Sequence, residues 1–229
     1  MRLIVADRRV LGFAALAVTI LTPMFVLSAD ALRGKTEAPI ALLRAVTLVA
    51  AVLFGYELFF TVQRVDTPRA PRIVRSALDE HIPFVPAWVW VYGALYYVFI
   101  AFPVGLFADS ASFARYLAGG IAMLVIALPV YVLWPTQSLP AWRAHDDAGI
   151  SIRFLKFIQT FDNGRACVPS LHMAFSVYAA TFYPWRASLL LVPGLVGAAC
   201  VLVKQHSILD LVPGAMLGLA VGLYVNTLF

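Results

Sequence analysis

The fold and the chemistry of this chain both centre on residues 168–214, which read VPSLHMAFSVYAATFYPWRASLLLVPGLVGAACVLVKQHSILDLVPG. This stretch holds two of the four histidines, His172 and His206, and Asp210 follows the second by one helical turn. Two apolar runs lie between the histidines. If each run crosses a bilayer, the chain goes out and returns, and both histidines lie on the same side of the membrane.

His206 and Asp210 are spaced for one face of a helix, because 3.6 residues complete a turn. A carboxylate in that position can hold an imidazole in one tautomer and stabilise its charged form. The pair therefore suits a nucleophilic histidine, although a single His-x-x-x-Asp at a helix start is often a structural contact.

Membrane-spanning helices follow from the composition, which is 62% hydrophobic and 13% charged over 229 residues. Several apolar runs reach the roughly 20 residues that cross a hydrocarbon core as a helix. Unpaired backbone groups exclude other folds in lipid unless a barrel closes. We therefore expect an all-α, polytopic membrane helical bundle with about seven (six to seven) transmembrane helices.

The whole chain, 1–229, is expected to form a single integral membrane domain, with the catalytic core in about 135–229. The first apolar run carries Pro23 and lacks a small-residue cleavage pattern, which favours a retained helix over a signal peptide. The expected spans are about 10–28, 40–62, 87–107, 113–134, 170–183, 186–203 and 207–228.

The formal net charge of +5 indicates topology signals and contacts with headgroups or phosphate, and we expect no nucleic-acid partner. Cys167 and Cys200 are too few for a disulfide framework. Arg44, near the start of the second span, is expected to extend its side chain to the membrane interface. Glu57 lies deeper in that span, where a carboxylate is either functional or bonded to a neighbouring Tyr or Arg for structure.

The polar stretches between spans carry most of the remaining charge. A short interfacial helix is expected around residues 73–80, and the aromatic residues of the third span suit an interfacial belt. Residues 135–167 form the longest loop, which we expect to contact substrate. Within it, His145, Asp146 and Asp147 are adjacent in sequence and cannot converge on one metal ion, so they are interpreted as solvated charge.

Two motifs carry a resemblance to a known family. Residues 169–172, Pro-Ser-Leu-His, and residues 206–214, HSILDLVPG, resemble the second and third signature motifs of the type 2 phosphatidic acid phosphatase superfamily. Leucine at position 171 is closer to the branch that contains inositol phosphorylceramide synthases and their bacterial relatives. The resemblance is specific over about 163–214 and weaker in the segments DEHIPFVPAWVWVY and LWPTQ.

The resemblance implies a role for each matching residue. His206 would attack phosphorus to form a phosphohistidine, and Asp210 would orient it. His172 would protonate the leaving alkoxide and later activate the acceptor. Ser170 would donate a hydrogen bond to a phosphoryl oxygen. The implied substrate is a phospholipid, the acceptor is water or a lipid alcohol, and no cofactor or metal is needed.

The family's usual phosphate-binding cations are missing from this chain. The positions of its Ser-Arg pair read Ala199 and Cys200, and the upstream Lys-x6-Arg-Pro motif is absent. Because the transition state needs fixed positive charge, the expected replacements are Lys204 first, Arg165 second and Arg143 third.

A run of small residues follows the second motif, with glycines at 214, 218 and 222. In an apolar helix, four-residue spacing of glycine favours close helix packing. Contact with the helix of His172 would bring both histidines to one phosphate.

Three alternatives remain open, namely a small transporter with a Glu/His proton relay, a catalytically dead scaffold, and a metal hydrolase that uses the two histidines and Asp210 as ligands. We expect a multi-pass protein of a bacterial inner (cytoplasmic) membrane. The positive-inside tendency places the site at the cytoplasmic face, whereas this superfamily commonly works at the outer face. The sequence does not predict the oligomeric state.

Overall fold

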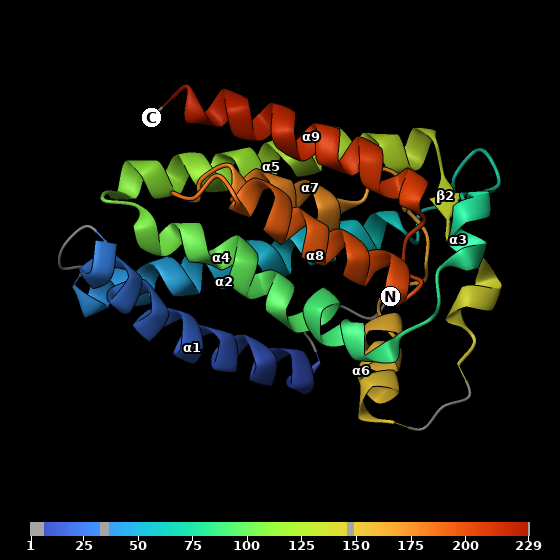
Figure 1. Ribbon diagram of the computed structural model, residues 1–229, viewed down its shortest axis with the longest axis horizontal. Coiled ribbons are helices and arrows are strands. Elements are labelled where there is room, and N and C mark those ends of the chain that lie inside the picture. The colour runs from blue at the N-terminus through green and yellow to red at the C-terminus, as the bar shows by residue number, and fades with distance from the viewer. Residues whose placement is uncertain (1–6, 33–36, 146–148, 229) are drawn as a thin grey trace.

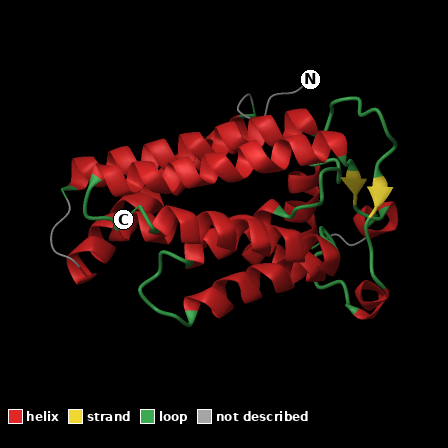
Figure 2. Ribbon diagram, turned by 90° about the horizontal axis from the view of Figure 1, so that it is seen from above, coloured by secondary structure: helices red, strands yellow, loops and turns green. Residues whose placement is uncertain are grey.

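The computed structural model describes residues 7–32, 37–145 and 149–228. Its long helices run side by side along one axis, and short elements gather at one end of the bundle (Figures 1 and 2). The helices along the axis are α1 (Arg8–Leu32), α2 (Ala38–Val62), α4 (Tyr96–Leu106), α5 (Ser110–Leu133), α7 (Leu171–Ala180), α8 (Ser188–Leu202) and α9 (Ile208–Asn226).

The remaining elements are short. A 3-10 turn, η2, and a π-helical turn, η3, lead into α4. In chain order, all the short elements are β1 (Arg72–Ile73), α3 (Ala77–His81), η2 (Pro86–Trp88), η3 (Val91–Leu95), β2 (Thr136–Gln137), η4 (Pro140–Arg143) and α6 (Ile150–Gln159).

The expectation of a helical membrane protein is confirmed, but the expected number of spans is not. In the part of the chain that the structure describes, five helical stretches are long and apolar enough to cross a membrane, against the six or seven expected. Helices α7 and α8 fall short, with 10 and 15 residues. The five stretches are 8–29, 38–62, 86–106, 110–133 and 208–226.

Helix α7 is short because protein, not lipid, surrounds it. It packs against α4, α5, α8 and α9, and most of its residues are buried. Irregular backbone is tolerated at membrane depth where neighbouring groups satisfy it. Asn226 of α9 donates from Nδ2 to Oγ1 of Thr181 at 3.1 Å, and Tyr183 donates its hydroxyl to the carbonyl of Phe99 at 2.9 Å. The turn after α7 therefore has partners of its own.

The glycines of α9 lie against α7, as their spacing predicts. A Cβ atom at Gly218 would overlap the carbonyl of Ala174, and one at Gly214 would overlap the carbonyl of Ser170. At Gly222 the obstacle would be the side chain of Thr181. The two backbones therefore touch along the length of α7.

Arg44 contacts the end of a neighbouring helix. Its side chain is buried and donates to the carbonyls of Phe107 at 2.8 Å and Val104 at 3.4 Å. The last carbonyls of a helix lack partners within that helix, so Arg44 caps the end of α4.

The long polar segment after α5 is folded, not an open loop. It contains β2, which pairs in parallel with β1, and the helix α6, which the sequence did not predict. The expected interfacial helix before the third span is also shorter than predicted, since only Ala77–His81 is helical. Buried Thr136 accepts hydrogen bonds at Oγ1 from the amides of Cys167 and Val168, at 3.0 and 3.1 Å. This contact fixes the chain as it enters α7.

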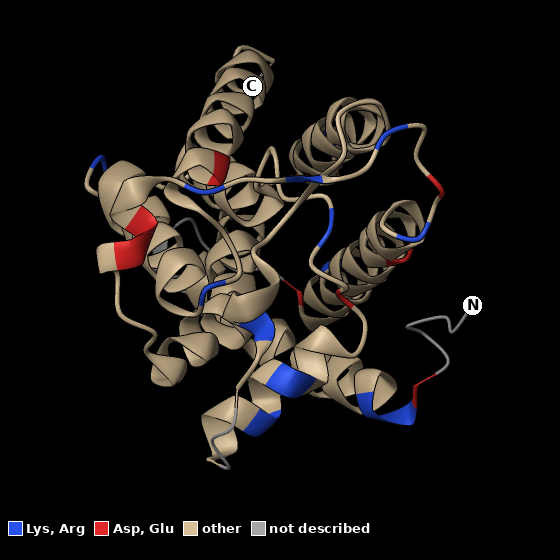
Figure 3. Ribbon diagram, turned by 90° about the vertical axis from the view of Figure 1, so that its right-hand side faces the viewer, with Lys and Arg blue, Asp and Glu red and all other residues tan. Residues whose placement is uncertain are grey.

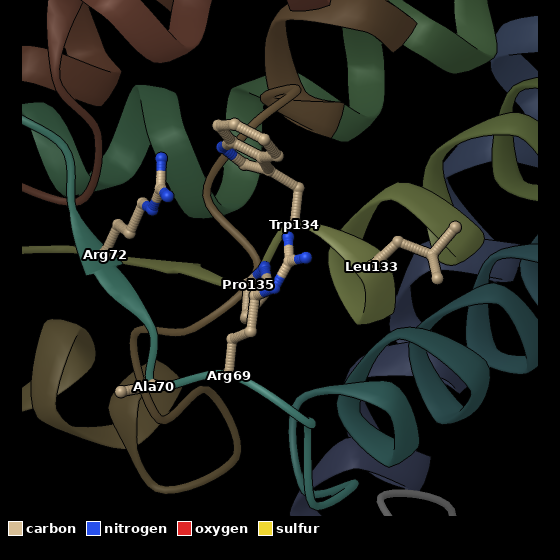
Figure 4. Close-up of a pocket in the computed structure, with 6 residues that line it drawn as sticks. All are labelled: Arg69, Ala70, Arg72, Leu133, Trp134 and Pro135. Atoms are coloured by element: carbon tan, nitrogen blue, oxygen red, sulfur yellow. The ribbon is translucent and has the colours of Figure 1, made fainter.

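The short elements, and the charges they carry, lie together at one end of the bundle (Figure 3). Helices α7 and α9 begin at this end, and α8 ends there (Figure 1). A small pocket at this end is lined by Arg72 and Trp134, and the Cζ of Arg72 lies 4.5 Å from the centre of the Trp134 ring (Figure 4). Neither His172 nor His206 lines that pocket.

The contact between α9 and α7 makes a prediction about stability. Gly218→Ala should destabilise the protein by about 1–3 kcal/mol, because an added methyl forces two packed backbones apart. Gly194→Ala on α8 is the matched control, since nothing lies within 4 Å of the position of its Cβ. Thermal unfolding in detergent, followed by tryptophan fluorescence, should show a lower midpoint for Gly218→Ala alone. Equal midpoints for the two variants would contradict the contact.

Candidate active site

His172 and His206 lie together at the end of the bundle where the short elements gather. Their ring centres are 6.0 Å apart, with an angle of 60° between the ring planes. His172 is the second residue of α7, and His206 lies in the turn between α8 and α9. The amide of Ser170 donates to the carbonyl of Asp210 at 3.0 Å, which joins the starts of α7 and α9 directly.

Asp210 holds the ring of His206 in one orientation. With its proton placed on Nδ1, His206 donates to Oδ2 of Asp210 at 3.2 Å. The same oxygen accepts from the amide of Ser207 at 2.9 Å, so the carboxylate is itself fixed. The Asp210 side chain is 1% exposed and that of His206 10%. This tautomer leaves the lone pair of Nε2 available as a nucleophile.

His172 is held by aromatic rings. Tyr92 stacks on it at 4.1 Å between ring centres, and Tyr96 lies at 4.6 Å. Both tyrosines are buried, so the expectation that they belong to an interfacial belt is wrong. They turn inward because the π-helical turn η3 and the start of α4 face α7 and α8. A π-helical turn is frequent at functional sites.

Ser170 begins α7 as its N-cap residue. Its hydroxyl oxygen accepts from the amide of Met173 at 3.4 Å, and the residue is fully buried. A serine at this position satisfies one of the free amides at a helix start. Ser170 therefore fixes the direction in which α7, and with it His172, leaves the preceding loop.

Arg143 is the cation that the structure places beside the nucleophile segment. Its Nη1 lies 3.3 Å from Oε1 of Gln205, the residue before His206, and its Nη2 donates to the carbonyl of Asp162. The Asp162 carboxylate is 4.0 Å away, and the Arg143 side chain is 18% exposed. A guanidinium has five N–H donors, so these contacts leave others for an anion.

Lys204 points away from the histidines despite its place in the sequence. Its ammonium donates to the carbonyls of Asp79 at 2.7 Å and Ile82 at 2.5 Å. It also lies 5.3 Å from the centre of the Trp142 ring. Burial lowers the pKa of Lys204 below its ordinary value, and the charge of Asp79 opposes that shift. The ammonium is thus engaged with α3 and not with the space between the two imidazoles.

Arg165 is held through its backbone. Its carbonyl accepts from Nε2 of Gln63 at 2.7 Å, and its amide donates to Oδ1 of Asn163 at 3.0 Å. It lines a small pocket, together with Gln63 and Tyr131, that includes neither histidine. Of the three expected cations, Arg143 is the one whose side chain contacts Gln205, the residue before His206.

Asp79 is a buried carboxylate that the sequence did not single out. It belongs to α3, outside the spans, and accepts from the hydroxyl of Ser207 at 2.6 Å and the amide of Ile208 at 3.0 Å. Burial raises the pKa of this carboxyl, but hydrogen bonds from Ser207, Ile208 and Ser76 lower it more, so its pKa lies below the ordinary value. The resemblance in DEHIPFVPAWVWVY was the only sequence signal for this residue.

The other candidate residues lie elsewhere. Glu57 is half-buried on α2, which packs mainly against α1, α5 and α4. His145 stacks on Phe84 at 4.4 Å between ring centres, while Asp146 and Asp147 lie outside the described residues. Among the residues that the structure describes, no group of three or more His, Cys, Asp or Glu side chains is arranged to hold a metal ion.

Comparison with known proteins identifies a family for most of this chain. Residues 69–224 match the family model of the PAP2 superfamily. The curated proteins and the solved structures yielded no match. The matched region covers most of the chain and includes α3, both histidines and the helix of Asp210. Such a match indicates a phosphatase- or phosphotransferase-type function in a membrane protein, and the chain belongs to the PAP2 superfamily.

Proposed function

We propose that this chain is a membrane enzyme that cleaves a phosphoester of a phospholipid through a phosphohistidine intermediate. The observation that carries the proposal is the pairing of His206 with Asp210 at 3.2 Å, opposite a second imidazole whose ring centre is 6.0 Å away. The phospho-headgroup or phosphate passes first to the enzyme and then to a lipid alcohol or to water. The substrate reaches the site from the bilayer that surrounds the spans.

In the first step, Nε2 of His206 attacks phosphorus and the bond from phosphorus to the lipid oxygen breaks. His172 gives a proton to the leaving alkoxide, which departs as a lipid alcohol. Burial and the neighbouring His206 lower the pKa of His172 to about 3, so this step requires the bound anionic phosphate to raise that pKa and let the ring take up the proton. Asp210 accepts the hydrogen bond from Nδ1 throughout, and so stabilises the positive charge that develops on the imidazole.

In the second step, the oxygen of the acceptor attacks the phosphohistidine. His172, now neutral, takes the proton from the acceptor, and the bond between phosphorus and Nε2 breaks. His206 and His172 return to their starting states. A labelled phospholipid with and without diacylglycerol or ceramide distinguishes the acceptors, because the label ends either in a new lipid or in a water-soluble product.

The phosphoenzyme provides the direct test of this mechanism. With a phospholipid labelled at phosphorus, the wild-type protein should gain a label that is stable in base and lost in acid, as a phosphoramidate is. His206→Ala should gain none, and His172→Ala should form the label more slowly by a factor of about 10²–10⁴, the usual contribution of a general acid.

His81→Ala serves as the control, because His81 is exposed and its ring bonds to the carbonyl of Ala77 in its own helix. It should label as the wild type does. A normal label on His206→Ala would end the proposal.

Metal removal separates this mechanism from a metal hydrolase. Proton transfer by His172 and attack by His206 require no metal, so activity should survive dialysis against EDTA within about two-fold. The measurement is product release before and after dialysis, with and without added Mg²⁺ or Zn²⁺. Loss of activity that either ion restores would favour the metal hydrolase.

We assign the phosphate-binding charge to Arg143. Arg143→Gln should lower kcat/KM by roughly 10- to 100-fold, because a charge-assisted hydrogen bond to the phosphoryl group is lost. It should also weaken inhibition by inorganic phosphate. Arg153→Gln is the control, since Arg153 is exposed on α6. If Arg143→Gln left both quantities unchanged while Lys204→Met reduced them, Lys204 would be the phosphate ligand.

A further inference from the structure

We infer that Asp79 is a positioning residue for the nucleophile, and that it acts through Ser207 and Asp210 while Lys204 holds its helix in place. Its part in the reaction rests on the proposed function, whereas the contacts themselves do not. Asp79 lies 128 residues before Ser207 in the sequence, on the short helix α3.

The carboxylate of Asp79 caps the start of α9. Oδ2 accepts from the hydroxyl of Ser207 at 2.6 Å, and Oδ1 accepts from the amide of Ile208 at 3.0 Å. The amide of Ser76 donates to Oδ2 at 2.6 Å and fixes the carboxylate from its own side. The first amides of a helix lack partners within it and attract negative charge. Asp79 therefore determines where α9 begins.

Ser207 links Asp79 to the nucleophile through hydrogen bonds. Its hydroxyl donates to Asp79, and its amide donates to Oδ2 of Asp210 at 2.9 Å. That same oxygen accepts from Nδ1 of His206. A shift of Ser207 would therefore move the carboxylate that orients the ring. Such displacements reduce rates even when the altered residue does not touch the reacting atoms.

Lys204 makes a second contact between α3 and the turn that precedes α9. Its ammonium donates to the carbonyl of Asp79, in the middle of α3, and to that of Ile82, just after the helix ends. Lys204 has φ of +56°, a conformation that residues other than glycine rarely adopt. The carboxylate of Asp79 on α3 thus accepts hydrogen bonds from the start of α9. The ammonium of Lys204, in the turn before α9, donates to a carbonyl of α3. The two elements are held together from both sides of His206.

Asp79 is not placed to act on the substrate itself. It is 2% exposed, and its oxygens are bonded to Ser76, Ser207 and Ile208. Its neighbour Glu80 offers a matched control, because that side chain is 64% exposed and pairs with Arg75 at 3.5 Å. Both residues are acids on the same helix, and only one contacts α9.

The test compares Asp79→Asn with Glu80→Gln in lipid nanodiscs. Asp79→Asn should lower kcat by about 10- to 100-fold with KM within about two-fold of the wild type, since the phosphate contacts are unchanged. Glu80→Gln should match the wild type in both. A role limited to folding would lower the yield of protein and leave kcat per folded molecule unchanged, and that result would overturn the inference.

A double-mutant cycle tests the route through Ser207. Ser207→Ala should lower kcat as Asp79→Asn does, and the double variant should lose no more than the larger single loss. Losses that multiply would show that Asp79 does not act through Ser207. If Asp79→Asn fails to fold, Ser207→Ala alone carries the test, with the same expected fall in kcat at constant KM.

Hydrogen exchange gives a reading that does not depend on activity. Amides in residues 204–211 should exchange faster in Asp79→Asn than in the wild type, and Glu80→Gln should show wild-type protection. If the wild type forms no phosphoenzyme, the proposed function fails, and the positioning of α9 is then decided by exchange alone. Equal protection in all three proteins would overturn it.

Discussion

Along α9, glycines at 214 and 218 let the helix backbone lie directly on the backbone of Ser170 and Ala174, and Gly222 makes room for the side chain of Thr181 at the end of α7. In lipid, no hydrophobic driving force brings two apolar helices together, because the lipid tails are as apolar as the helix surfaces. Such contacts therefore depend on close packing and hydrogen bonds. The amide of Ser170 donates to the carbonyl of Asp210 at the end of this contact. His172 and His206 can face each other only because these two helix starts are joined.

Polar groups from distant segments complete the backbone of this bundle. Arg44 caps α4, Asn226 satisfies the turn after α7, and Thr136 holds the chain before the Pro-Ser-Leu-His motif. An unpaired buried backbone group costs several kcal/mol in lipid. The same requirement explains why the site can be built from short and irregular elements, since each is bonded to a longer helix beside it.

The members of the site differ in how well the sequence predicts them. His172, His206 and Asp210 follow from local spacing and from the number of apolar runs between them, and the structure brings them together. The phosphate-binding cation cannot be predicted from local spacing. The position of Lys204 in the sequence indicates which end of the bundle it occupies but not which way its side chain points. Local spacing could not predict the role of Asp79 either, because its hydrogen-bond partners lie 128 and 129 residues away in the sequence.

The sequence was sufficient to predict the class of protein, the approximate places of the apolar helices and the pairing of His206 with Asp210. These depend on composition, run length and helical period, which are properties of short stretches. The three-dimensional packing was needed to show that α7 is a short helix enclosed by others and that Tyr92 and Tyr96 are buried against His172. It was also needed to show that the side chain of Arg143 contacts Gln205, whereas the ammonium of Lys204 bonds to α3 and Ile82. Those outcomes depend on which groups, distant in the sequence, can bond to a buried charge or backbone group. The packing of the helices determines which of these groups come close enough to do so.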